Sequence, residues 1–202
     1  MHSVIRWLVV ASFAASATFA GGVATAADCK IETDETDKFT KVRTVITRRN
    51  SLESFWGDSS KDKQKDIYVA AWYKDGNKAL QIGLWFTNYV ERMPPDYELR
   101  NTLVIPKESR LLVMMADGSI VTLHSVNPIN ANSRATRTSS RVSVDTGATI
   151  YYPLDDDLIT ALTSQGATKL RVEAAEKHYD FEVHEKSLTD IGDAIQCLQA
   201  TL

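Results

Sequence analysis

Residues 67–87 read IYVAAWYKDGNKALQIGLWFT, in which two apolar, aromatic-rich runs flank a group of turn-forming residues. The runs Ile67–Tyr73 and Ala79–Thr87 are rich in the β-branched and aromatic residues that favour strands. Between them, Lys74–Asn77 contains an Asp-Gly pair, which suits the positive φ angles of a tight hairpin turn. This stretch therefore predicts a β-hairpin at the centre of the fold.

The aromatic residues of this hairpin are expected to form the heart of the core, through Trp72, Trp85 and Phe86. Because adjacent residues in a strand point to opposite faces, one of Trp72 and Tyr73 should point outward, as should one of Trp85 and Phe86. If the outward residues lie side by side, they form an apolar patch fit for a ligand or partner. Trp72 and Trp85 are thus candidate ligand-binding residues, and the wider aromatic group also contains Trp56 and Tyr89.

Most of the chain outside this hairpin is also predicted to form strands, with a polar loop over Gly57–Lys65. The expected strands are Lys41–Arg49, Arg110–Met115, Ser119–His124, Thr149–Tyr152, Thr168–Ala174 and Tyr179–His184. Two segments are weaker candidates: Thr102–Ile105, which is short, and Arg134–Val144, which alternates weakly. Asp117-Gly118 marks a second tight hairpin.

Two short helices are expected towards the C-terminus. Asp155, Asp156 and Asp157 precede an apolar segment that ends near Gly166, a pattern that suits the dipole of a short helix. Ser187 is the expected cap of a second helix, in which apolar residues recur at helical spacing: Leu188, Ile191, Ile195 and Leu198. The predicted fold is mainly β or α+β: an antiparallel sandwich or strongly bent sheet of about eight short strands with two short helices.

The N-terminus has the three parts of a secretory signal peptide. Arg6 provides a positive charge, an apolar stretch follows, and Ala24–Ala27 offers an A-x-A cleavage site. A membrane anchor is the alternative, but the apolar run is shorter than the ~20 residues of a spanning helix. We expect residues 1–27 to be removed and residues 28–202 to form one domain in the periplasm or outside the cell. Asp28 before Cys29 disfavours lipidation.

The two cysteines, Cys29 and Cys197, lie near the two ends of the processed chain. In an oxidising compartment such a pair favours an intramolecular disulfide; independent thiols or an intermolecular bond are the alternatives. The spacing is not C-x-x-C, so a redox-active pair is not expected.

The opening Cys29–Ile31, followed by the acidic stretch Asp34–Asp37 and then Phe39-Thr40, resembles the start of small exported bacterial β-rich domains of uncharacterised function. The later order is similar as well: Asp117-Gly118, Tyr152-Pro153, a short helix, and the strand Lys169–Val172. The resemblance implies a β-rich exported domain, and it carries over no activity and no site residue.

The net charge of −3 becomes about −4 when Arg6 is removed, which argues against nucleic acid as the main partner. No second apolar run is long enough to span a membrane. The expected partner is an unknown envelope or extracellular molecule.

The best metal-ligand candidates are His178, Asp180, Glu182 and His184, since residues two apart share one face of a strand. The simpler interpretation is the solvated face of an outer strand. A second candidate is an anion-binding patch of Arg137 and Arg141, which share one face of the expected strand. Arg134 lies nearby, on the opposite face of that strand. Its simpler interpretation is a charged edge strand that resists aggregation.

The chain contains no G-x-S-x-G, S-x-x-K, H-E-x-x-H or Gly-rich phosphate loop, and no cofactor is expected. The leading hypothesis is an exported, non-enzymatic binding or interaction module. The alternatives are a small exported hydrolase or a metal-binding protein, either of which would use the region of His178 and His184.

Overall fold

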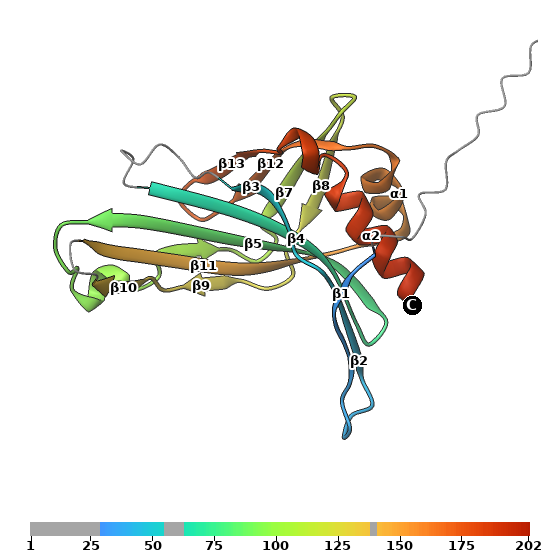
Figure 1. The fold of residues 1–202 in the computed structure, drawn as a ribbon, viewed down its shortest axis with the longest axis horizontal. Helices are drawn as coiled ribbons and strands as arrows, with labels where there is room; N and C mark the ends of the chain where they lie inside the picture. The colour runs from blue at the N-terminus through green and yellow to red at the C-terminus, as the bar shows by residue number, and fades with distance from the viewer. Residues whose placement is uncertain (1–28, 55–62, 138–140) are drawn as a thin grey trace, which may run out of the picture.

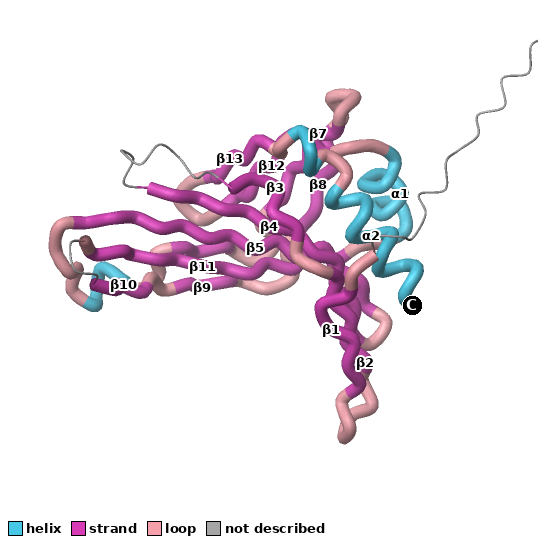
Figure 2. The backbone as a smooth tube through the Cα atoms, in the orientation of Figure 1, coloured by secondary structure: helices cyan, strands magenta, loops and turns pink. Residues whose placement is uncertain are grey.

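The computed structural model describes residues 29–54, 63–137 and 141–202. The expected signal peptide over residues 1–27, Asp28, Trp56 and most of the expected loop over Gly57–Lys65 lie outside these residues. Figure 2 shows that strands make up most of the molecule, as predicted. No helix among the described residues is long and apolar enough to cross a membrane.

A curled, antiparallel, seven-stranded sheet forms the larger part of the fold, in the order β1-β2-β4-β5-β11-β10 with β3 beside β4 (Figure 1). Its strands are β1 (Ile31–Thr36), β2 (Arg43–Thr47), β3 (Asn50–Ser54), β4 (Lys63–Lys74), β5 (Asn77–Val90), β10 (Arg134–Arg137) and β11 (Val142–Pro153). The long strands β4, β5 and β11 run across the view in Figure 1, and the β1–β2 hairpin projects away from them.

A smaller, four-stranded sheet in the order β13-β12-β7-β8 covers part of one face, and a two-stranded sheet pairs β6 with β9. These strands are β6 (Leu103–Ile105), β7 (Arg110–Met115), β8 (Ile120–His124), β9 (Ile129–Ala131), β12 (Ala167–Glu173) and β13 (His178–Glu182). The helices are α1 (Asp156–Ser164), α2 (Asp190–Thr201) and the short 3₁₀ turns η2 (Asp96–Leu99) and η3 (Glu185–Ser187). The predicted class, a strongly bent antiparallel sheet with two helices near the C-terminus, is therefore confirmed.

The central hairpin forms where the sequence predicts it. Asp75 and Gly76 adopt φ angles of 50° and 82°, as a tight turn between right-twisted strands requires. The strands on either side are longer than expected, so that residues 63–65 of the expected loop belong to β4. The segment Arg134–Val144 is not one strand: it divides into β10 and the start of β11, which pair with each other.

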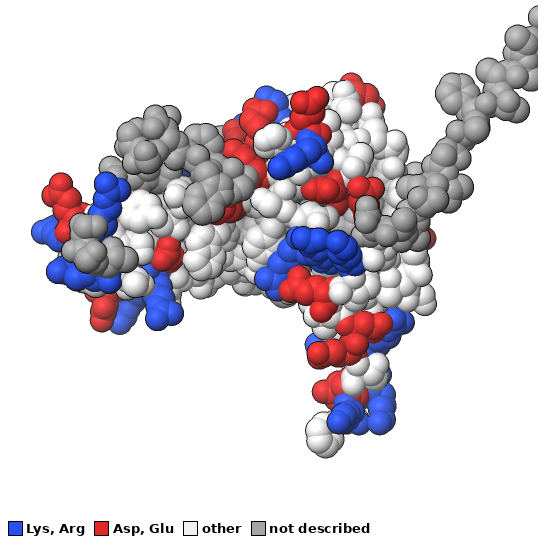
Figure 3. All heavy atoms as spheres, in the orientation of Figure 1, with Lys and Arg blue, Asp and Glu red and all other residues white. Residues whose placement is uncertain are grey.

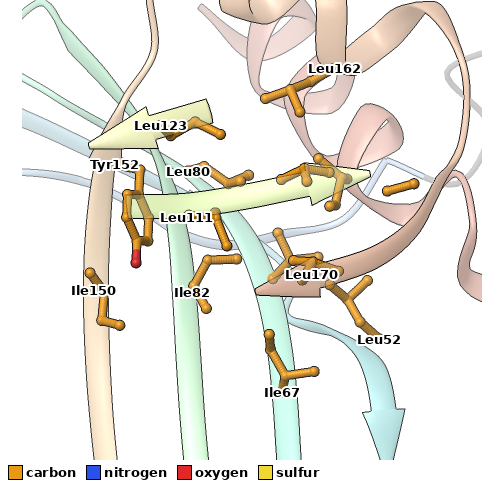
Figure 4. Packing of buried hydrophobic residues seen from close by; sticks show 14 of the residues in the cluster. Leu52, Ile67, Leu80, Ile82, Leu111, Leu123, Ile150, Tyr152, Leu162 and Leu170 are labelled. Carbon is orange, nitrogen blue, oxygen red and sulfur yellow. The ribbon is translucent and has the colours of Figure 1, made fainter. Parts of the chain in front are cut away.

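The core lies between the inner face of the large sheet and the smaller sheet. Figure 4 shows residues of both sheets meeting there: Ile67, Leu80, Ile82, Ile150 and Tyr152 from the long strands, and Leu111, Leu123 and Leu170 from the smaller sheet. Burying one Leu or Ile side chain completely stabilises the folded state by ~1.5–3 kcal/mol relative to leaving it in water. The expectation that Trp72 and Trp85 form the heart of this core is wrong, because Trp72 is only half-buried and Trp85 is 47 % exposed. Phe86 packs against the core from its margin.

Both predicted helices are present. The side chain of Asp155 accepts a hydrogen bond from the backbone N–H of Leu158 at 2.8 Å, which caps α1 as expected. Ser187, in contrast, does not cap α2: its hydroxyl donates to the carbonyl of Ser51 at 3.3 Å, and α2 begins after Thr189. The apolar face of α2 is buried against β2 and β4.

A disulfide joins Cys29 to Cys197, with Cα atoms 5.1 Å apart. It links the residues just before β1 to α2, as the positions of the cysteines suggested.

Candidate ligand-binding site

The outer face of the large sheet, opposite the core, is the first candidate surface. Alternation along β5 points Leu80, Ile82 and Leu84 inward, and it points Gln81, Gly83 and Trp85 outward. The register of β4 and β11 with β5 then defines which of their residues share this outer face.

Two aromatic rings lie flat on this face because glycines in the neighbouring strands leave room for them. A Cβ atom at Gly83 of β5 would overlap the ring of Tyr68 on β4. A Cβ atom at Gly147 of β11 would fall 2.6 Å from the indole of Trp85 on β5. Each ring therefore covers a glycine of the next strand. Trp85 is 47 % exposed above its glycine, whereas the Arg49 guanidinium lies over the Tyr68 ring.

A second pair of rings meets across β5. Trp72 on β4 and Tyr151 on β11 approach to 5.3 Å between ring centroids, tilted by 56°. The register places Trp72, Tyr151, Tyr68 and Trp85 on four successive rows of the outer face, in that order. We call these four residues the aromatic band; six residue steps along a strand make it ~20 Å long.

Polar contacts hold the rings of the aromatic band in place. The indole N–H of Trp85 donates to the Thr87 hydroxyl at 3.2 Å, and that hydroxyl donates to Asp145 at 2.7 Å. The Tyr68 hydroxyl lies 3.4 Å from that of Thr149. Burial, with a smaller effect of Tyr68, raises the pKa of the Tyr151 phenol. The rings of Trp85 and Tyr68 are thus held in place before any ligand arrives.

One end of the aromatic band opens into a cavity of about 910 Å³, in the range of small-molecule sites. Trp72, Tyr151 and Pro153 line its apolar side. Its polar lining includes Lys74, Asn77, Lys78, Asn127, Asp155 and Asp156. The cavity therefore combines an aromatic wall with amide, ammonium and carboxylate groups.

The predicted metal ligands lie on an exposed strand where cations pair with them. Asp180 accepts two hydrogen bonds from Arg171, at 2.6 and 2.8 Å, which lowers the pKa of its carboxyl group. Glu182 pairs with Lys169 at 2.7 Å. His178 lies 3.7 Å from Asp180.

His184 lies beyond the end of β13, where its backbone N–H donates to Leu52. Within the described ranges no group of three His, Cys, Asp or Glu side chains is placed to hold a metal ion. His178 and His184 line neither the cavity beside Trp72 nor a second one beside Phe86, so the hydrolase and metal-binding alternatives gain no support from these cavities.

The predicted arginine patch lies at the hairpin that joins β10 to β11. Arg137 ends β10 opposite Val142, and Arg141 comes just before β11; the residues between them lie outside the described part. Figure 3 shows Lys and Arg side chains, with Asp and Glu side chains among them, at this end of the long strands. The structure therefore separates the arginines from the Trp72 end of the aromatic band.

Sequence reasoning missed Tyr68 and Tyr151, although two signals could have found them. Once Trp85 is placed outward, the hairpin register places Tyr68 on the same face. A glycine inside a strand, such as Gly83 or Gly147, often marks a close approach of another group.

Comparison of the chain with protein-family models, with curated proteins and with solved structures finds no match. The resemblance to exported β-rich domains therefore remains an expectation from the sequence.

Proposed function

We propose that this chain is an exported, non-enzymatic binding module that holds a saccharide chain against the aromatic band. The observation that carries the proposal is the placement of one ring on each of four successive rows of the outer sheet face. The disulfide is compatible with an oxidising compartment outside the cytoplasm.

A saccharide matches this surface because its sugar rings have apolar C–H faces and polar hydroxyl edges. The flat ring of Trp85 offers the apolar contact, and its indole N–H is held by the Thr87 hydroxyl, so little side-chain entropy is lost on binding. At the other end, Asn127 and Asp156 in the cavity beside Trp72 offer hydrogen-bonding groups for the hydroxyls of the chain end.

The neutrality of the outer face also fits a saccharide. The paired residues on the four rows of the band are neutral except for Asp66, and Asp145 lies on the next row, opposite Arg134 of β10. The Arg49 guanidinium lies over Tyr68, 5.5 Å from the ring centroid, and it is paired with Glu32 at 3.1 Å. A strongly charged ligand would find few opposite charges along the band.

The test is co-sedimentation of the oxidised, processed chain with insoluble polysaccharides: purified peptidoglycan sacculi and, separately, cellulose. We expect at least one of them to retain the protein, and Trp72→Ala and Trp85→Ala each to weaken retention by about tenfold. Tyr97→Ala is the matched control, because Tyr97 is 73 % exposed but lies in η2, away from the band. If neither polysaccharide retains the protein, or if the tryptophan variants are retained as well as the control, the proposal is wrong.

A further inference from the structure

A second cavity lies on the opposite, inner face of the large sheet, where β4, β5 and β11 extend past the smaller sheet. Its volume is about 490 Å³. Phe86, Val144 and Thr146 come from the long strands, Leu103 from β6, and Tyr179 from β13. The curl of the sheet thus borders an open hollow that the core residues do not fill.

The floor of this cavity is apolar. The rings of Phe86 and Tyr179 approach to 4.6 Å between centroids, and Leu103 and Val144 continue the apolar lining. The hydroxyls on the wall satisfy one another: Ser133 donates to Thr102 at 2.7 Å and contacts the hydroxyl of Thr146. With these hydroxyls paired, the apolar floor suits a hydrocarbon group, and the amides of Gln64 and Asn88 complete the lining.

Cations lie at the rim of the cavity. Lys177 lies 4.9 Å above the ring of Tyr179, and it forms no ion pair with a carboxylate within the described part of the chain. Lys65, in contrast, donates to the Asp180 carbonyl at 2.7 Å and lies 3.5 Å from Glu53. Arg137 is on the same face as Val144, near the end of the long strands where Figure 3 shows basic side chains.

We propose that this inner cavity binds an amphipathic acid, with its hydrocarbon chain on Phe86, Leu103 and Val144 and its anionic head group at Lys177. An apolar floor beside a cation with no carboxylate partner among the described residues matches both parts of such a ligand. The head group can come from a free fatty acid or from an anionic membrane lipid, which share this chemistry. The site is separate from the aromatic band, because Phe86 and Trp85 point to opposite faces of β5.

The test is isothermal titration calorimetry of the oxidised, processed chain with decanoate, and with decanol as the uncharged counterpart. We expect decanoate to bind more tightly than decanol, and Lys177→Gln to weaken decanoate binding by about tenfold while leaving decanol binding unchanged. Lys186→Gln is the matched control, because Lys186 is exposed and lies outside the cavity. Trp85→Ala should not change decanoate binding, which keeps this result independent of the saccharide test.

Sedimentation with lipid vesicles separates the two sources of the acid. Binding of decanoate without binding to phosphatidylglycerol vesicles identifies a free acid as the ligand. Binding to phosphatidylglycerol but not phosphatidylcholine vesicles, reduced by decanoate and by Lys177→Gln, identifies an anionic lipid. If neither decanoate nor the vesicles bind, or if binding does not respond to Lys177→Gln, the inference is overturned.

Discussion

Thr47 lies where the strand that pairs with β4 changes from β2 to β3. Its hydroxyl oxygen accepts a hydrogen bond from the backbone N–H of Ala71 at 2.8 Å, and both residues are buried. The side chain thus replaces the ladder hydrogen bond that neither β2 nor β3 supplies at this point.

Replacing Thr47 by Val keeps the shape of the side chain but leaves the Ala71 N–H buried without an acceptor. We expect Thr47→Val to lower the free energy of unfolding by ~1–3 kcal/mol. Thr47→Ser keeps the hydroxyl and should cost less. Urea denaturation followed by circular dichroism measures both, and equal stability of the Val variant and the natural chain would show that the hydrogen bond contributes nothing.

Asp117 titrates at an unusually low pH because of its position in the β7–β8 turn. The hydroxyl and backbone N–H of Ser119, and then Gln165, donate hydrogen bonds to its carboxylate and lower its pKa from 3.8 to about 2. Since the pKa is lower in the folded state, the stabilising contribution of this group is present above pH 3.8 and is lost as the pH falls towards 2.

We therefore expect the Asp117 carboxyl group to titrate near pH 2 when followed by carbon NMR in the folded protein. The Asp117→Asn variant should lose less stability than the natural chain between pH 4 and pH 2. A midpoint at or above 3.8, or an unchanged acid dependence in the variant, would contradict this assignment.

At the scale of elements, the position of the Tyr68 ring of β4 over β5 depends on Gly83. An alanine Cβ at this position would overlap the Tyr68 ring, so the ring would have to leave its place over β5. We expect Gly83→Ala to lower the free energy of unfolding by ~1–3 kcal/mol. The Tyr68→Ala variant provides the control, since Gly83→Ala should cost much less once the ring is absent. Additive costs in this double-mutant cycle would show that the two residues do not compete for the same space.

The elements that the sequence predicted well are those whose signals are local. The Asp75-Gly76 and Asp117-Gly118 turns form tight hairpins, and Asp155 caps α1. The length of β11 was not predictable from local signals. It pairs with β5 over its whole length, so its extent depends on contacts with a strand that is distant in the sequence. For the same reason the sequence pattern predicts one strand over Arg134–Val144, although this segment turns back on itself.

The tryptophans illustrate a conflict between hydrophobicity and alternation. The size and hydrophobicity of Trp85 favour burial. Trp85 nevertheless lies on the same face of β5 as Gln81 and Gly83, and the residues that alternate with them, such as Ile82, point inward. Alternation decides the outcome, because a one-residue shift would expose every leucine of β5. The candidate site could therefore be predicted only in part: one of its strands was visible in the sequence, but Tyr151 required the register of β11.

At the scale of the molecule, the curl of the large sheet explains why the two proposed sites have different chemistry. The outer face carries the aromatic band, with small residues such as Gly83 and Gly147 beneath the rings. The inner face is covered by the smaller sheet and the helices over most of its area, and it leaves a cavity only where the long strands continue beyond them. A saccharide on one face and an acid on the other can thus bind independently.

The disulfide between Cys29 and Cys197 encloses nearly all of the described fold, since the two residues are 168 positions apart. On the chain-entropy model, closing so long a loop lowers the entropy of the unfolded chain and stabilises the fold by ~5 kcal/mol. The Cys29→Ala/Cys197→Ala double variant should therefore unfold at a lower urea concentration than the oxidised chain.

The α2 helix of this variant should stay in place, because Ile191, Ile195 and Leu198 remain buried in the core. Amide hydrogen exchange should become faster in β1 and in the last turn of α2, while β5 and β11 keep their protection. If the variant is as stable as the oxidised chain, or if exchange rises equally in every strand, the disulfide does not act by restraining the two ends of the chain.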